Sequence, residues 1–296
     1  MSIQQARLDA SWNLRGAMFM VLAMACFAVE DAFLKKAASS VPVGQVLLSF
    51  GLIGLCVFSA LALAAGERPF IRTMVSRVMI ARSLLEIVGR LFFMLAIAIT
   101  PLSTASAILQ ATPLVVIAGA AVFFGEKVGF LRWLAIVFGF VGVLMILRPG
   151  ADGFGILSLL AVIATLGFAG RDLATRSAPV SMSHRQLGVL GFTMLIVSGL
   201  IALPFGGPPV VPDLQSALSL LAGSLSGIVA YSSLTTAMRT GQVSAVTPFR
   251  YTRLVFAMIA GIVMFREQPD TWTLIGSVIV VGAGIAALSV SRRRAR

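Results

Sequence analysis

The sequence has little of what most catalytic and metal-binding sites require. Its 296 residues include two cysteines, Cys26 and Cys56, and a single histidine, His184. Both cysteines lie in apolar runs, where they are expected to pack as small side chains, so we predict neither a disulfide framework nor a metal site. The sequence also lacks a phosphate-binding loop, a nucleophile elbow and an HExxH motif, which argues against ATP-driven transport and intramembrane proteolysis. We therefore expect a protein that is not an enzyme and that needs no cofactor.

Charged residues are scarce too, at 11% of the chain, whereas 58% of the residues are hydrophobic. Soluble domains contain about half apolar and a quarter charged residues, so this composition predicts an all-α integral membrane protein. A helix of about 20 apolar residues crosses the hydrocarbon layer. Such windows predict ten transmembrane helices, near residues 14–36, 43–65, 77–99, 102–124, 128–147, 154–175, 185–204, 214–238, 243–265 and 270–290.

The basic residues predict which side of the membrane holds the termini. An even number of spans puts both termini on one side, and short cytoplasmic loops are enriched in lysine and arginine. A cytoplasmic N-terminus places most of the basic residues inside: Arg7, Arg15, Arg68, Arg72, Arg77, Lys127, Arg132, Arg176, Arg185, Arg239 and the tail over 291–296. We assign the net charge of +12 to this topology and not to nucleic acid binding.

The two halves of the chain resemble each other at a shift of 141 residues. Asp31 falls on Asp172 and Glu126 falls on Glu267 at this shift, and such matches are informative because acidic residues are rare here. Each half holds five predicted spans, an odd number, so the second half enters the membrane from the opposite side. We predict two inverted five-helix repeats, over 14–150 and 154–290, followed by a basic cytoplasmic tail over 291–296.

Two consecutive stretches resemble a known family: PLSTASAILQATPLVVIAGAAVFFGEKV over 101–128 and RWLAIVFGFVGVLMILRPG over 132–150. They are similar to the ten-span drug/metabolite transporter superfamily with its duplicated five-span EamA unit. That resemblance covers nearly the whole chain and implies a carrier of small metabolites. Two shorter stretches, AVEDAFLKK (28–36) and VTPFRYTRLVF (246–256), also resemble a bacterial branch associated with riboflavin and related metabolites. This second resemblance implies riboflavin-like vitamin uptake across the bacterial inner membrane.

Ionisable residues inside the predicted spans mark the candidate site, because a charge in hydrocarbon needs a partner or a water-filled cavity. Arg82, Glu86 and Arg90 share one face of the third span, and the ninth span carries two more arginines. The 141-residue shift does not reproduce these groups. A scaffold needs symmetry, whereas a site for an asymmetric small molecule does not. We therefore predict that the central pathway is lined by Arg90, Gln110, Thr112, Arg250, Tyr251 and Arg253.

The remaining charged residues have competing interpretations. The repeat keeps two pairs that we predict to be structural ion pairs, Asp31 with Lys35 and Asp172 with Arg176. Glu30 and Glu86 are candidates for proton coupling, and either could instead be an ion-pair partner of a nearby arginine.

Three functional hypotheses follow. The first is a secondary transporter that takes up a small amphipathic or anionic metabolite, and the second is an exporter of amino acids or related metabolites. The third is a structural or receptor-like membrane protein, which the asymmetric charges disfavour. The expected partners are a small-molecule substrate and the lipid bilayer, and the glycine-rich segments 139–143 and 276–285 leave a homodimer open.

Overall fold

The structure is a computed structural model that describes residues 3–125, 129–147, 156–176, 182–240 and 247–294. Within these residues every regular element is a helix, which confirms an all-α fold. The α-helices are α1 (Ile3–Ala37), α2 (Val43–Ala64), α3 (Arg77–Ile99), α4 (Leu102–Leu109), α5 (Thr112–Phe124), α6 (Phe130–Leu147), α7 (Leu159–Arg176), α8 (His184–Ala202), α9 (Leu214–Thr240), α11 (Thr252–Phe265) and α12 (Thr271–Arg294). Short 3-10 helices are η1 (Arg72–Val75), η2 (Ile156–Ser158), η3 (Leu203–Phe205) and η4 (Thr247–Tyr251).

The helix bounds lie close to the predicted spans. Five segments are long and apolar enough to cross a membrane by length and composition: Leu14–Ala37, Val43–Ala64, Leu102–Phe123, His184–Phe205 and Leu214–Met238. The protein is therefore a helical membrane protein, while the count of ten spans and the inverted repeat stay predictions. The predicted basic tail continues α12 as far as Arg294, and residues 295–296 lie outside the described part of the chain.

Two of the predicted spans are broken. The fourth is divided between α4 and α5 at residues 110–111, and the described part of the ninth starts as the 3-10 helix η4 before α11. Pro113 opens α5 and Pro248 lies in η4. Proline has no N–H and so cannot continue the hydrogen-bond ladder of a preceding helix. Irregular backbone at membrane depth is tolerated only where protein or water covers it.

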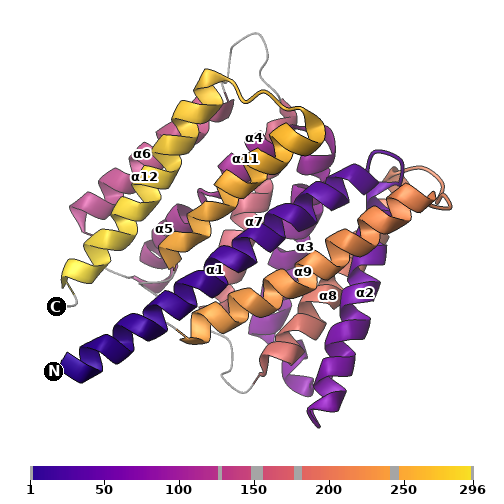
Figure 1. Cartoon of the computed structure of the whole chain (residues 1–296), viewed down its shortest axis with the longest axis horizontal. Coiled ribbons are helices and arrows are strands. Elements are labelled where there is room, and N and C mark those ends of the chain that lie inside the picture. Colours follow the sequence, from indigo (N-terminus) through magenta and orange to yellow (C-terminus); the bar gives the residue numbers. More distant parts are fainter. Residues whose placement is uncertain (1–2, 126–128, 148–155, 177–181, 241–246, 295–296) are drawn as a thin grey trace.

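Helices from the two halves of the chain pack against each other in pairs. In Figure 1, α1 lies along α9 and α6 along α12, and α3 packs on α7 and α2 on α8. At the 141-residue shift α1 corresponds to α7 and α3 to α9, so the α1–α9 and α3–α7 pairs are equivalent. The start of α1 and the end of α12 lie at one end of the molecule, which we call the proximal end (Figure 1). Contacts described below bring the ends of α1, α3 and α11 together at the opposite, distal end.

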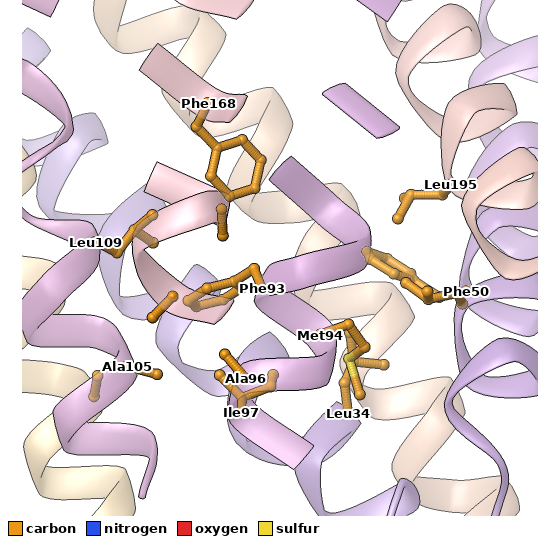
Figure 2. Packing of buried hydrophobic residues seen from close by; sticks show 14 of the residues in the cluster. Leu34, Phe50, Phe93, Met94, Ala96, Ile97, Ala105, Leu109, Phe168 and Leu195 are labelled. Atoms are coloured by element: carbon orange, nitrogen blue, oxygen red, sulfur yellow. The ribbon is translucent and has the colours of Figure 1, made fainter. Parts of the chain in front are cut away.

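A buried apolar core joins these helix pairs. Figure 2 shows Phe93 of α3 and Phe168 of α7 side by side within this core, with ring centroids 6.2 Å apart. Elsewhere the helix backbones themselves touch: a Cβ added at Gly44 of α2 would lie 2.6 Å from the backbone nitrogen of Leu203, just after α8. Small residues of this kind let membrane helices approach closely. The core thus fixes α1, α3 and α7 around the charged residues described next.

Arg266, which ends α11, has the left-handed backbone conformation that favours glycine, with φ of 53°. Gly125 has a similar conformation after α5, with φ of 65°, and lies 141 residues earlier. A side chain in this conformation costs about 1 kcal/mol. We therefore expect Arg266→Gly to raise the midpoint of thermal unfolding by about 2 °C. Gly125→Ala should lower it, and a lower midpoint for Arg266→Gly would show that the guanidinium contributes more stability than the backbone strain removes.

Candidate functional site

The two broken spans meet near the middle of the molecule. Gln110, at the end of α4, donates a hydrogen bond from Nε2 to the backbone carbonyl of Arg250 at 3.3 Å. The hydroxyl of Thr112 donates a hydrogen bond to the carbonyl of Leu109, three residues earlier, at 2.6 Å. The breaks are thereby tied to each other, and half-helices that end at the bilayer midplane are a common way to build transport sites.

Glu86 of α3 is the centre of a buried group of arginines. Its carboxylate lies 3.3 Å from Arg82 Nη2, 3.5 Å from Arg90 Nε and 3.0 Å from Arg171 Nη1. Arg82 and Arg90 are one helical turn away on either side, so α3 presents all three charges on one face. Arg171 comes from α7 and also contacts Asp172, with 2.8 Å between Nη2 and Oδ1. This group links α3 of the first half to α7 of the second.

The carboxylates of α1 extend the same network. Glu30 Oε1 lies 3.4 Å from Arg90 Nη1, and Asp31 Oδ2 accepts a hydrogen bond from Arg253 Nη2 at 2.7 Å. The other oxygen of Glu30, Oε2, is buried and has no hydrogen-bond partner among the described residues. A Cβ at Gly227 of α9 would lie 2.9 Å from it, so the bare glycine leaves that oxygen its space.

Aromatic rings flank the guanidinium groups. The Arg253 guanidinium lies 5.0 Å from the ring centroid of Phe27 and 5.5 Å from that of Phe93. Arg171 and Arg90 approach the ring of Phe168, at 5.0 and 5.8 Å. These separations allow cation–π attraction, which strengthens where water is excluded.

These residues form what we call the central cluster: Arg82, Arg90, Arg171, Arg250, Arg253, Glu30, Asp31, Glu86 and Asp172. It contains five guanidinium groups and four carboxylates, one more cation than anion. The side chains of the central cluster differ in accessibility. The side chain of Glu30 is 2% exposed, that of Arg253 is 16% exposed and that of Arg250 is 32% exposed. Arg250 is also loosely held, because its ion pair with Asp172 measures 4.0 Å.

The structure brings together most of the residues that the sequence singled out. Arg90, Arg250, Arg253, Glu30 and Glu86 all belong to the central cluster. Gln110 and Thr112 lie at the break beside it. Tyr251 differs: it is 4% exposed, and its hydroxyl lies against Gly284 of α12 and not in the cluster.

The ion pair of Asp31 differs from the predicted one. Asp31 is bound by Arg253, whereas Lys35, one turn further along α1, donates to the carbonyls of Ile97 and Thr100 at the end of α3. The physical reason is that the end of a helix leaves carbonyls without partners, and two of them lie within hydrogen-bond distance of the Lys35 ammonium. Asp172 is paired with Arg171, and the side chain of its predicted partner Arg176 lies outside the described residues.

Arg171 is the main residue that the prediction left out. It occupies the repeat position of Glu30, so the two halves place opposite charges at equivalent sites. That reversal was visible in the sequence and could have identified Arg171. As for metals, no group of three or more His, Cys, Asp or Glu side chains lies close enough to hold an ion in the part of the chain that the structure describes.

Comparison with known proteins identifies relatives of the whole chain. The EamA-like transporter family matches residues 14–148 and again residues 155–289. A riboflavin transporter of Rhizobium johnstonii is 29% identical over 297 residues, which cover 98% of this chain and 96% of the relative. An S-adenosylmethionine uptake transporter of Rickettsia bellii is 31% identical over 73% of this chain and 72% of its own length.

Two further relatives extend the comparison. A pseudopaline exporter of Pseudomonas aeruginosa is 27% identical over 94% of this chain and 96% of its own length. One solved crystal structure matches 97% of this chain and 99% of its own with a TM-score of 0.63. The two sequences are 19% identical, so this similarity is evidence for the fold of the chain and not for its function.

Proposed function

Because the chain belongs to the EamA-like transporter family, we propose that it is a secondary transporter that moves a small amphipathic or anionic metabolite by alternating access. The family match over both halves of the chain is the observation that carries this proposal. Transport between two repeats around a shared central site needs no cofactor and no covalent chemistry on the substrate.

The proposed architecture is a ten-span protein with two inverted repeats, over 14–150 and 154–290. The equivalent packing of α1 on α9 and of α3 on α7 supports it, as do the two breaks at Gln110 and Tyr251, which are 141 residues apart. In an inverted repeat, equivalent half-helices enter the centre from opposite sides. The central cluster would then lie at the interface that opens alternately to each side.

A riboflavin-like vitamin is the proposed substrate, taken up into the cell. Relatives named riboflavin transporter in Rhizobium johnstonii and Vibrio cholerae match at least 90% of this chain. The central cluster supports the same choice, because guanidinium groups donate to carbonyl and imide oxygens and stack on flat aromatic rings. Its excess of one positive charge is unfavourable for a sulfonium cation such as S-adenosylmethionine. Export of an amino acid or related metabolite is the second candidate, supported by the pseudopaline exporter.

Thermal stabilisation by ligands tests the substrate proposal. Purified protein would be heated with riboflavin, with S-adenosylmethionine and with a panel of amino acids, since a ligand that binds only the folded state raises the unfolding midpoint. We expect riboflavin to raise it and the others to leave it unchanged. Stabilisation by amino acids alone would favour the exporter, and uptake or efflux in vesicles with imposed pH gradients would then give the direction.

Glu30 is the better of the two candidates for proton coupling. Glu86 faces three guanidinium groups, whereas Glu30 has one, at 3.4 Å, and one oxygen without a partner. A buried carboxylate with an unsatisfied oxygen gains more from binding a proton than one surrounded by cations. We propose that Glu30 exchanges the proton and that Glu86 stays an ion-pair partner.

The proposed orientation places both termini in the cytoplasm of a bacterial inner-membrane protein. A reporter fused after Arg296 should therefore be active in the cytoplasm, and an epitope inserted in the exposed loop over 206–212 should be accessible from the periplasm. Termini on opposite sides would rule out an even number of spans, and periplasmic termini would reverse the orientation.

A further inference from the structure

Lys35 closes the end of α3 at the distal end of the molecule. Its ammonium donates to the backbone carbonyls of Ile97 and Thr100, at 2.7 Å each, and lies 5.2 Å from the ring centroid of Phe265 in α11. The last carbonyls of a helix have no partner within the helix and carry its negative pole. One cation from α1 therefore satisfies α3 and contacts α11.

Glu267 caps the start of α4, the helix that follows α3. Its carboxylate accepts from the backbone N–H of Leu102 at 2.6 Å, from the N–H of Ser103 at 3.0 Å and from the Ser103 hydroxyl at 2.8 Å. Leu102 begins α4, and the residue before it, Pro101, offers no side-chain cap. The first N–H groups of a helix are unsatisfied and form its positive pole, which favours an anion. The cap of α4 thus comes from the loop after α11, in the other half of the chain.

The backbone at the end of α11 places the Glu267 carboxylate against the start of α4. The left-handed turn at Arg266 directs the chain back, so that the N–H of Glu267 bonds the carbonyl of Gly261 at 3.1 Å. A Cβ at Gly261 would lie 2.5 Å from Glu267 Oε2, so a larger residue there would force the carboxylate to move from its place against α4.

We propose that Lys35 and Glu267 form a latch that holds the distal end of the transport pathway closed and that must release before the pathway opens there. This inference rests on the proposed alternating access. The most exposed side chain of the central cluster, Arg250, lies in η4, at the opposite end of the η4–α11 segment from Glu267, while the contacts of Lys35 and Glu267 hold α1, α3, α4 and α11 together at the distal end. Glu267 joins the two halves directly through its hydrogen bonds to Leu102 and Ser103. Lys35 contacts the second half through the ring of Phe265, and its hydrogen bonds to Ile97 and Thr100 stay within the first half.

The same contacts explain why the latch can open. When the halves separate, water enters between them and can take over the hydrogen bonds of the Leu102 and Ser103 N–H groups. Breaking the latch therefore exchanges charged caps for water and does not leave buried polar groups unpaired. Two states that differ by a few such contacts can both be populated, and loss of one contact shifts the balance between them.

Thiol labelling in the absence of substrate tests the latch. Ser106 lies one helical turn beyond Ser103 in α4, and it is 1% exposed with no hydrogen-bond partner for its hydroxyl among the described residues. Ser106→Cys, in a chain with Cys26→Ala and Cys56→Ala, would report opening of the distal end. Ser198→Cys, buried in α8, would report general unfolding instead. Labelling in nanodiscs reaches both faces, so the result does not depend on orientation.

We expect Glu267→Gln to raise the labelling rate at position 106 about tenfold or more, since it removes a charge-assisted contact to two N–H groups. Lys35→Met should act in the same direction. The matched control is Glu67→Gln, which removes another carboxylate that links the two halves, through Ser183 and Arg185, away from the latch. It should leave the rate at position 106 unchanged, and the rate at position 198 should stay low in every variant.

An unchanged rate in both latch variants overturns the proposal, and so does an equal rise at positions 106 and 198, which would show simple loss of stability. If Glu267→Gln fails to fold, Ser103→Ala removes only the hydroxyl contact and should give a smaller rise at position 106, whereas no rise there would also overturn it. Because no substrate is present, failure of the latch leaves the ligand-binding test standing. Failure of the substrate proposal likewise leaves the labelling result standing.

Discussion

Arg250→Ala is expected to weaken riboflavin binding by roughly ten- to a hundredfold, the equivalent of one charge-assisted hydrogen bond. Arg250 has the most exposed side chain of the central cluster, and its ion pair with Asp172 is long, at 4.0 Å. A guanidinium held so loosely keeps donors for a substrate oxygen, whereas Arg253 is held by Asp31 at 2.7 Å. Binding would be measured by titration of the purified protein. Arg250→Lys should recover only part of the affinity, because an ammonium lacks the planar pair of donors.

Arg185→Ala is the matched control for this prediction. Arg185 is also an exposed arginine with a carboxylate partner, Glu67, but it lies at the start of α8 and outside the central cluster. Its loss should leave riboflavin binding unchanged. Parent-like binding by Arg250→Ala, together with lost binding by Arg253→Lys, would move the substrate deeper into the cluster, beside Asp31.

Hydropathy predicted the helices well because a helix that crosses a bilayer must satisfy its own backbone and remain apolar over about 20 residues. Those constraints are local, so a single sequence reveals them. The breaks at residues 110–111 and in η4 were less evident, since proline near a helix start is compatible with an unbroken span. That the two breaks lie next to each other became clear only from the structure, which places Gln110 against the backbone of Arg250.

The central cluster could be predicted in composition but not in its pairing. Charges within apolar spans identified Arg90, Glu86 and Arg253, because burial of a charge without a partner is costly. Which carboxylate binds which arginine depends on contacts between distant helices, and the local pair of Asp31 and Lys35 was misleading for that reason. Tyr251 was assigned to the pathway by its neighbours in sequence, but a residue next to two arginines on a helix points elsewhere, here toward Gly284.

Glu86→Leu is expected to be the most destabilising single change in the central cluster. Glu86 is 3% exposed and lies within 3.5 Å of Arg82, Arg90 and Arg171, so its loss removes the carboxylate that these three guanidinium groups share, although Arg90 keeps Glu30 and Arg171 keeps Asp172. Removal of one partner from a buried ion pair costs about 3–5 kcal/mol. The free energy of unfolding in mixed micelles should fall by about this amount. Glu67→Gln, which breaks the partly exposed pair with Arg185, should cost about 1 kcal/mol or less.

A second substitution separates loss of charge balance from loss of packing. Arg82 is 6% exposed and lies one turn before Glu86, so Arg82→Leu with Glu86→Leu replaces a buried ion pair on α3 by two apolar side chains. The double substitution removes the Arg82 cation together with the Glu86 carboxylate, so it keeps the charge balance that Glu86→Leu alone disturbs. Buried ion pairs replaced by apolar residues in this way are often tolerated. The double variant should therefore be more stable than Glu86→Leu alone. Measured with the single variant Arg82→Leu as well, the double-mutant cycle should give a coupling free energy of about 1–3 kcal/mol. Additive losses would show that Glu86 stabilises the protein by filling space, and the assignment of Glu86 as the electrostatic link between α3 and α7 would then be wrong.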